Sequence, residues 1–143
     1  VTLQNLHMSK PADGGGLLNV QYCRRFLASG VTMTNGLDEE GGLLIRSNRD
    51  VRMRGVLVDA VGDQAIEISS GCGDRGRLVN LGAENIVLED STLRNGRGPA
   101  LDSCTAGGYR NITFRRVVLD GVGWGSSDQD MGGVRLKGKV SGT

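Results

Sequence analysis

The sequence predicts an all-β protein, a right-handed parallel β-helix (solenoid) of about five coils, and three observations lead to this prediction. Short runs of alternating aliphatic residues recur, three in each unit of 20 to 35 residues. Glycine turns separate the runs, and the chain contains 24 glycines against two prolines. Asparagine repeatedly precedes the first run of a unit. Such self-similarity at a period of a few tens of residues is the signature of a repeat architecture.

Each unit is expected to supply three strands. The first runs are anchored at Val1, Val31, Val51, Ile86 and Ile112. A second run follows at residues 6–8, 56–58, 92–93 and 117–119. A third run closes each unit after a glycine turn, at residues 17–20, 43–45, 66–68, 100–102 and 134–136. Alternate side chains of these strands would point inward, and coils stacked at about 4.8 Å would align the aliphatic residues in continuous internal ladders.

The alternative architecture is a β-sandwich, which also combines short strands with frequent turns. It fits less well, because a sandwich rarely repeats asparagine and alternating aliphatic residues in phase with the same turn. Residues 1–143 are therefore interpreted as one β-helix domain. Residues 19–30 are the only segment that could form a short amphipathic helix covering an end. Because they lie inside the chain, we expect the ends to be covered by loops, by a partner copy in a homo-oligomer, or by parts of a longer protein.

Composition bounds the possible partners. Of the 143 residues, 38% are hydrophobic and 23% charged, and the net charge is +1. This balance predicts no nucleic-acid partner and no anionic membrane. No apolar run is long enough for a membrane span. The three cysteines form no zinc pattern. Cys72 and Cys104, which end the closing runs of adjacent coils, could either form a disulfide or remain stacked thiols. The cysteines therefore do not indicate whether the protein works in an oxidising or a reducing compartment.

The closing runs place charged residues on one outer face. Their alternation puts Asn19, Leu44, Glu67, Asp102 and Arg135 in one outward column. Lys137 follows two residues after Arg135 on the same face. Such a column is either a solvated charge ladder, or an acid/base or cation-binding cluster in which crowding raises the pKa of one carboxylate.

The glycine turns before these runs carry a second set of charges. Asp63 lies in "GDQ", Arg97 in "GRG", and Asp128 and Asp130 in "GSSDQDMGG". Aspartate beside glycine commonly forms turns, although the last loop could also hold Ca²⁺, the one cofactor considered, through its oxygen atoms. Trp124 could stack on a sugar ring or be partly buried in its loop. The sequence assigns no residue as a metal ligand.

The order "GDQAIEI", "GRGPALDS" and "GVRLKG" resembles the active-site order of polygalacturonase-like β-helix glycoside hydrolases, within the pectin lyase-like superfamily. There, successive coils carry Gly-Asp-Asp, Gly-His-Gly and Arg-Ile-Lys. The resemblance matches Asp63 to the first aspartate, and Arg135 and Lys137 to the substrate-binding pair. Gln64 stands in place of the second aspartate and Arg97 in place of the histidine, which argues against inverting hydrolysis because that reaction needs two carboxyl groups.

The resemblance implies a β-helix protein related to polysaccharide-processing proteins, which binds or acts on acidic polysaccharide along an outer strand face. If it is an enzyme, it is a polysaccharide lyase, an epimerase or a glycoside hydrolase. The candidate catalytic residues are then Asp63, Glu67, Asp102, Arg135 and Lys137, and Arg97 and Trp124 would bind substrate. This implies a secreted or extracellular protein. The alternatives are a non-catalytic module like those of adhesins and tail fibres, or a small stand-alone β-helix from a mobile or environmental gene.

Overall fold

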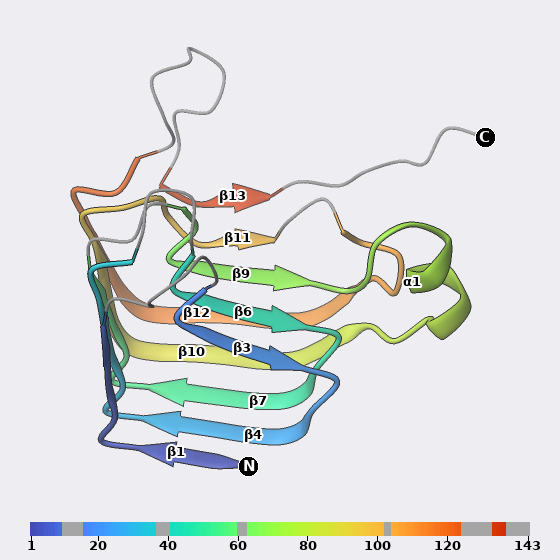
Figure 1. The fold of residues 1–143 in the computed structure, drawn as a ribbon, viewed down its shortest axis with the longest axis horizontal. Helices are drawn as coiled ribbons and strands as arrows, with labels where there is room; N and C mark the ends of the chain where they lie inside the picture. The colour runs from blue at the N-terminus through green and yellow to red at the C-terminus, as the bar shows by residue number, and fades with distance from the viewer. Residues whose placement is uncertain (10–15, 37–40, 60–62, 102–103, 124–132, 137–143) are drawn as a thin grey trace.

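The structure, a computed structural model, is a parallel β-helix and confirms the predicted fold class (Figure 1). It describes residues 1–9, 16–36, 41–59, 63–101, 104–123 and 133–136. Every strand pairing among them is parallel. The chain therefore returns to the same side of the molecule once in each turn.

The strands form three columns, and the strands that stack in a column are its rungs. The first column contains β1 (Thr2–Gln4), β4 (Arg24–Ser29), β7 (Arg49–Arg54) and the first parts of β10 (Ala83–Arg94) and β12 (Tyr109–Asp120). The second contains β2 (His7–Ser9), β5 (Thr32–Thr34), β8 (Leu57–Asp59) and the second parts of β10 and β12. The third contains β3 (Leu18–Gln21), β6 (Leu43–Arg46), β9 (Ile66–Ser69), β11 (Ala100–Leu101) and β13 (Arg135–Leu136). Because four returns of the chain join the rungs, the described solenoid makes about four full turns, slightly fewer than predicted.

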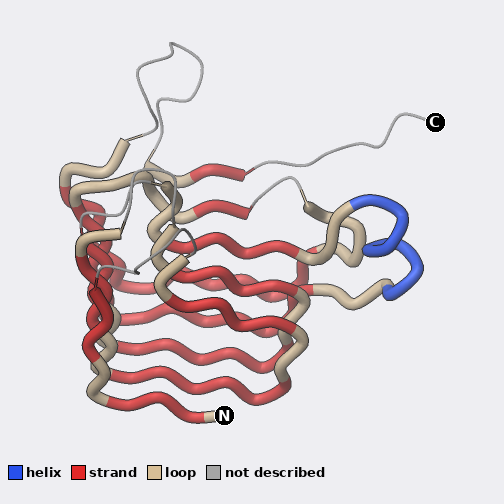
Figure 2. The backbone as a smooth tube through the Cα atoms, viewed as in Figure 1, coloured by secondary structure: helices blue, strands red, loops and turns tan. Residues whose placement is uncertain are grey.

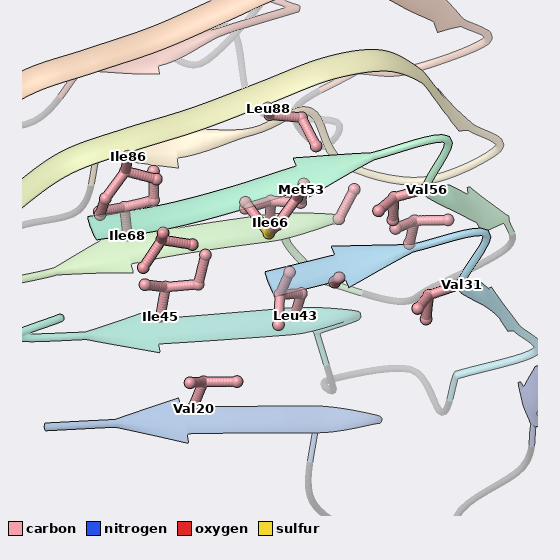
Figure 3. Close-up of a cluster of buried hydrophobic side chains, with 14 of the residues drawn as sticks. Val20, Val31, Leu43, Ile45, Met53, Val56, Ile66, Ile68, Ile86 and Leu88 are labelled. Carbon is pink, nitrogen blue, oxygen red and sulfur yellow. The ribbon is translucent and has the colours of Figure 1, made fainter. Parts of the chain in front are cut away.

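The core consists of internal aliphatic ladders, as the strand alternation predicts. Val20, Ile45 and Ile68 are register partners on successive rungs of the third column. All three are at most 5% exposed. They face the inward side chains of the first column, such as Met53 and Ile86, across the solenoid (Figure 3). This burial of apolar surface is the main force that holds the rungs together.

The expected helical cover at residues 19–30 is wrong, because this segment forms strands β3 and β4. Phe26 and Ala28 are buried at 1% and 5% exposure, whereas Leu27 between them is 46% exposed. That alternation has the period of a strand, and pairing with β1 and β7 on both sides satisfies the backbone of β4. The assignment of Val31 as a first-column anchor is also wrong, since it leads into β5 of the second column.

The described helix, α1 (Gly73–Val79), protrudes from the solenoid beyond the ends of the third-column strands (Figures 1 and 2). The chain leaves it at Asn80, which has a left-handed φ of 45°, a conformation that asparagine tolerates. Next to this excursion Cys72 and Cys104 form a disulfide, with 4.4 Å between their Cα atoms. Of the two alternatives left open by the sequence, the structure therefore has the bridge, and Cys23 is a free thiol.

Within the described residues there is no helix long and apolar enough to cross a membrane.

A ladder of polar side chains explains why asparagine recurs before the first runs. Asp50, Asn85 and Asn111 occupy equivalent places on three rungs, and each has a φ between 53° and 58°. The Asn85 amide donates to Asp50 Oδ1 at 2.9 Å, and the Asn111 amide donates to Asn85 Oδ1 at 3.1 Å. These residues bulge out of the strand register and offset the strain of left-handed backbone with side-chain hydrogen bonds.

Candidate functional site

The third column brings part of the predicted site together, but with one change of register. Its outward column runs through Glu67, Ala100 and Arg135, which are paired rung to rung. Ala100 thus takes the place expected for Asp102, because an isolated parallel bridge between Gln64 and Arg97 sets the register of this turn. Asp102 itself lies outside the described residues, as do Trp124 and Lys137.

The turn residues Asp63 and Arg97, which the sequence places in successive glycine turns, form an ion pair. Arg97 Nη1 donates to Asp63 Oδ1 at 2.7 Å, so one oxygen of this carboxylate is already occupied. Gln64, which is buried, lies against the same carboxylate, and its side-chain amide nitrogen can donate to Asp63 Oδ1 at 2.8 Å. The neutral amide of Gln64 cannot act as the second carboxyl group that inverting hydrolysis requires.

Asp63 and Glu67 line a shallow pocket of about 140 Å³. Its other walls are formed by small, apolar or amide-bearing residues: Gly16, Asn19, Gly41, Leu43, Leu44 and Gln64. Two carboxylates in one small pocket could bind hydroxyl groups of a sugar. Within the described part of the chain no group of three or more His, Cys, Asp or Glu side chains could hold a metal ion, and the loop considered for Ca²⁺, with Asp128 and Asp130, is not described.

A second candidate site lies on the outer face of the first column. In this column β4, β7 and the first parts of β10 and β12 carry eight arginines and four acidic residues. Outward positions of these strands stack on one another, so the charges gather on one surface although the whole chain has a net charge of only +1. This face therefore has an excess of positive charge.

At its centre four arginines surround two carboxylates, a group that we call the arginine cluster. Its members are Arg52, Arg54, Arg115, Arg116, Glu89 and Asp90. Arg52 Nε lies 3.3 Å from Glu89 Oε1, and the Arg115 guanidinium donates to Glu89 Oε2. Asp90 accepts from Arg54 Nε at 3.0 Å and from Arg116 Nε at 2.5 Å.

Left-handed backbone lets neighbouring residues of one strand join the cluster. In a regular strand Glu89 and Asp90, or Arg115 and Arg116, would point to opposite faces. Asp90 and Arg116 have φ values of 49° and 50°, which interrupts the alternation at the bend between the first and second columns. As a result, both residues of each pair take part in the same ion-pair network.

The network keeps its carboxylates ionised. The hydrogen bond from Arg115, followed by the charges of Arg115 and Arg52, lowers the pKa of Glu89 despite the burial of that side chain. The hydrogen bond from Arg116 is the main cause that lowers the pKa of Asp90, and Asp90 in turn raises the pKa of Arg116. Four cations and two anions leave an excess of two positive charges.

The cationic groups remain accessible. The four arginine side chains are between 49% and 69% exposed, whereas the Glu89 side chain is only 6% exposed. Beside them lies a hollow of about 350 Å³. Its walls are formed by Thr2, Gln4, Leu27, Ala28, Ser29, Arg52, Arg54 and Glu89. It thus combines guanidinium groups with hydroxyl and amide groups that suit a hydroxyl-rich ligand.

Acidification is expected to weaken the fold through this cluster. Because folding lowers the pKa values of Glu89 and Asp90, their ionised forms stabilise the folded state above the ordinary values of 4.5 and 3.8. That stabilisation is lost as the pH falls through and below these values. Denaturant unfolding between about pH 7 and pH 3 should show a flatter pH dependence in Glu89→Gln/Asp90→Asn than in the unmodified protein. An equally steep dependence would contradict this assignment.

Sequence reasoning missed the arginine cluster and concentrated on the closing runs. The available signal was arginine at alternate positions in "VRMRG", followed by "FRR" at the corresponding place two coils later. It was hidden because Glu89 and Asp90 on the intervening coil balance part of the charge. Only the rung register shows that arginines on either side converge on these two carboxylates.

Comparisons of the chain with protein families, with curated proteins and with solved structures found no significant match.

Proposed function

We propose that the protein binds an acidic polysaccharide on the outer face of the first column. The observation that carries the proposal is the arginine cluster. Its four half-exposed guanidinium groups outnumber the two carboxylates with which they form ion pairs. Guanidinium groups bind carboxylate and sulfate oxygens in bidentate geometry. Because the ion pairs already order the arginine side chains, a ligand loses less conformational entropy when it binds them.

The hollow beside the cluster favours a sugar polymer over other anions. Thr2, Gln4 and Ser29 supply hydroxyl and amide groups for sugar hydroxyls, and the exposed Leu27 supplies an apolar contact. None of the residues that form the cluster and this hollow is aromatic, so this part of the face lacks the rings on which single-stranded nucleic acids stack. The Cys72 to Cys104 disulfide is typical of an oxidising compartment, where polysaccharides rather than nucleic acids are the common anionic polymers.

The resemblance to polygalacturonase-like proteins of the pectin lyase-like superfamily supports the same ligand class. It also favours binding over hydrolysis, since Gln64 and Arg97 replace the groups that cleavage needs. If the protein has catalytic activity, Asp63, Glu67 and Arg135 on the third column are the residues to carry it. Mass spectrometry of polysaccharides incubated with the protein and with Arg135→Ala would detect hydrolysed or unsaturated products and show whether that column acts on the ligand.

Calorimetric titration with polygalacturonate, a sulfated glycan and neutral dextran tests the binding proposal. We expect both acidic polymers to bind, dextran to bind weakly or not at all, and added salt to weaken binding. The double variant Arg52→Gln/Arg54→Gln should lose at least about tenfold in affinity, because charge-assisted hydrogen bonds contribute about 1.5 to 3 kcal/mol each. Arg115 and Arg116 still pair with the carboxylates in this variant, so the fold should persist.

The matched control is Arg75→Gln/Arg77→Gln on α1, which removes the same charge away from the cluster. It should bind acidic polymers as the unmodified protein does. Equal losses in the two double variants would show that net charge alone attracts the ligand and would overturn the proposed site. Binding of duplex or single-stranded nucleic acid in preference to both acidic glycans would overturn the ligand class.

A further inference from the structure

The chain turns from the third column back into the first at the β3 to β4 and β6 to β7 connections (Figure 1). A small pocket lies at this corner. Its volume is about 180 Å³. We call it the corner pocket, and its walls are formed by Tyr22, Cys23, Arg24, Ser47, Arg49 and Leu81.

Two arginines of this pocket repel each other. Arg24 and Arg49 are register partners on β4 and β7, so their side chains leave adjacent rungs on the same face. Like charges directly opposite in a sheet are destabilising. Glu84, on the next rung, pairs with Arg49 Nη2 at 3.4 Å, whereas Arg24 has no ion pair among the described residues. An anion placed between Arg24 and Arg49 would relieve this repulsion.

Arg49 also has an unused hydrogen-bond donor. Its Nε is buried and has no hydrogen-bond partner among the described residues. A buried donor without an acceptor costs free energy and is rare in folded proteins. A ligand oxygen that reaches this Nε through a movement of the Arg49 side chain would satisfy it.

The remaining wall suits the apolar face of a sugar ring. Tyr22 is 57% exposed although it is aromatic, and its φ of 54° holds it at the turn. Its backbone N–H donates to the Arg46 carbonyl at 3.0 Å, which fixes the turn to the next rung. Leu81, 38% exposed, adds apolar surface to the same pocket. An exposed aromatic ring beside cationic groups can contact the C–H groups of a sugar while the cations bind its acid group.

We propose that the corner pocket binds one uronate residue of the polysaccharide, with its carboxylate on Arg24 and Arg49 and its ring on Tyr22. This inference rests on the proposed function and specifies its ligand. A carboxylate attached directly to the sugar ring keeps that ring within reach of Tyr22. Arg49 and Arg54 lie at the two ends of β7, roughly 16 Å apart along the strand. The bound polysaccharide therefore runs along β7, from the corner pocket to the arginine cluster.

Titration with oligogalacturonates of increasing length tests this assignment. Tyr22→Asn removes the ring and suits the left-handed backbone, whereas Tyr22→Phe keeps the ring. We expect Tyr22→Asn to weaken binding by about three- to tenfold, in line with the interaction of one aromatic ring, and Tyr22→Phe to bind normally. Arg24→Gln should weaken binding of the same oligomers, and affinity should rise with length until the oligomer reaches Arg54.

The outcomes separate this inference from the proposed function. Normal binding by Tyr22→Asn together with weak binding by Arg52→Gln/Arg54→Gln would overturn the corner pocket and leave the proposed function standing. Absence of binding to every acidic glycan would overturn both. A loss in Tyr22→Asn that is equally large for neutral oligosaccharides, or a preference of this pocket for sulfated over carboxylated oligomers, would overturn the uronate assignment. Thermal unfolding of each variant shows whether a loss reflects the fold.

Discussion

Replacement of Cys72 and Cys104 by serine is expected to lower the free energy of unfolding by about 4 kcal/mol. The two cysteines are 32 residues apart in the sequence, and their bridge closes a loop that contains α1, β10 and β11. Closing a loop of this length removes conformational entropy from the unfolded chain. The bridge also ties the α1 excursion to the segment that leads into β12.

Denaturant unfolding of the unmodified protein and of Cys72→Ser/Cys104→Ser, each with and without a thiol reductant, measures this effect. Reductant should destabilise the unmodified protein to the level of the double variant and leave the variant unchanged. Cys23→Ser is the control, because Cys23 is a free thiol, which donates to the Gln21 carbonyl at 3.4 Å. A loss in Cys23→Ser as large as that in the double variant would contradict the prediction.

Asn48→Ala is expected to destabilise the protein by about 1.5 to 4.5 kcal/mol, since it leaves the Cys23 N–H without its acceptor, at about 1 to 3 kcal/mol, and removes a second hydrogen bond to the Val20 carbonyl, at about 0.5 to 1.5 kcal/mol. The Asn48 side chain is fully buried between two rungs. Its amide donates to the Val20 carbonyl at 2.6 Å, and its Oδ1 accepts from the Cys23 N–H at 2.5 Å. It therefore holds the turn between β3 and β4 to the turn above.

Thermal and denaturant unfolding of three variants tests the role of Asn48. Asn48→Asp keeps an acceptor for Cys23, but it loses the donor to Val20 and places a carboxylate in a fully buried site, so near pH 7 it should destabilise the protein at least as much as Asn48→Ala. Asn19→Ala is the matched control, because Asn19 is exposed and accepts only from Gln21 among the hydrogen bonds of the described residues. A surface change of this kind should alter stability by no more than about 0.5 kcal/mol. Equal effects of Asn19→Ala and Asn48→Ala would refute the assignment.

Local alternation was sufficient to predict the strands of the third column. Inward positions such as Ile45 and Ile68 repeat with a period of two and are bounded by glycine turns, so the pattern agrees with the structure. Residues 19–30 misled the prediction because Tyr22, Phe26 and Leu27 are spaced as on a helix face. In the structure Phe26 packs in the core whereas Tyr22 and Leu27 are exposed, which tertiary pairing with β7 determines.

The candidate sites, like the strands, could be predicted only in part from the sequence. The placement of Asp63 and Arg97 in successive glycine turns could be predicted, and the two side chains form an ion pair, although the register partner of Arg97 is Gln64. The rung partner of Glu67 could not be predicted, because the length of the preceding turn sets the register and places Ala100 beside Glu67. The places of Asp90 and Arg116 could not be predicted, because alternation assigns side chains to the inner or outer face of a strand and a residue with left-handed backbone interrupts it.

The sequence by itself determined that the chain forms an all-β parallel solenoid, because alternating aliphatic residues and recurrent glycine turns are local properties of each coil. Tertiary structure decided which residues of different coils are neighbours, because turns of unequal length set the register between rungs. Arg54, Glu89 and Arg115, which are far apart in the sequence, share one outward column only through that register. The same stacking brings Cys72 to Cys104 and Arg24 to Arg49, and it thereby creates the disulfide and the cationic surface.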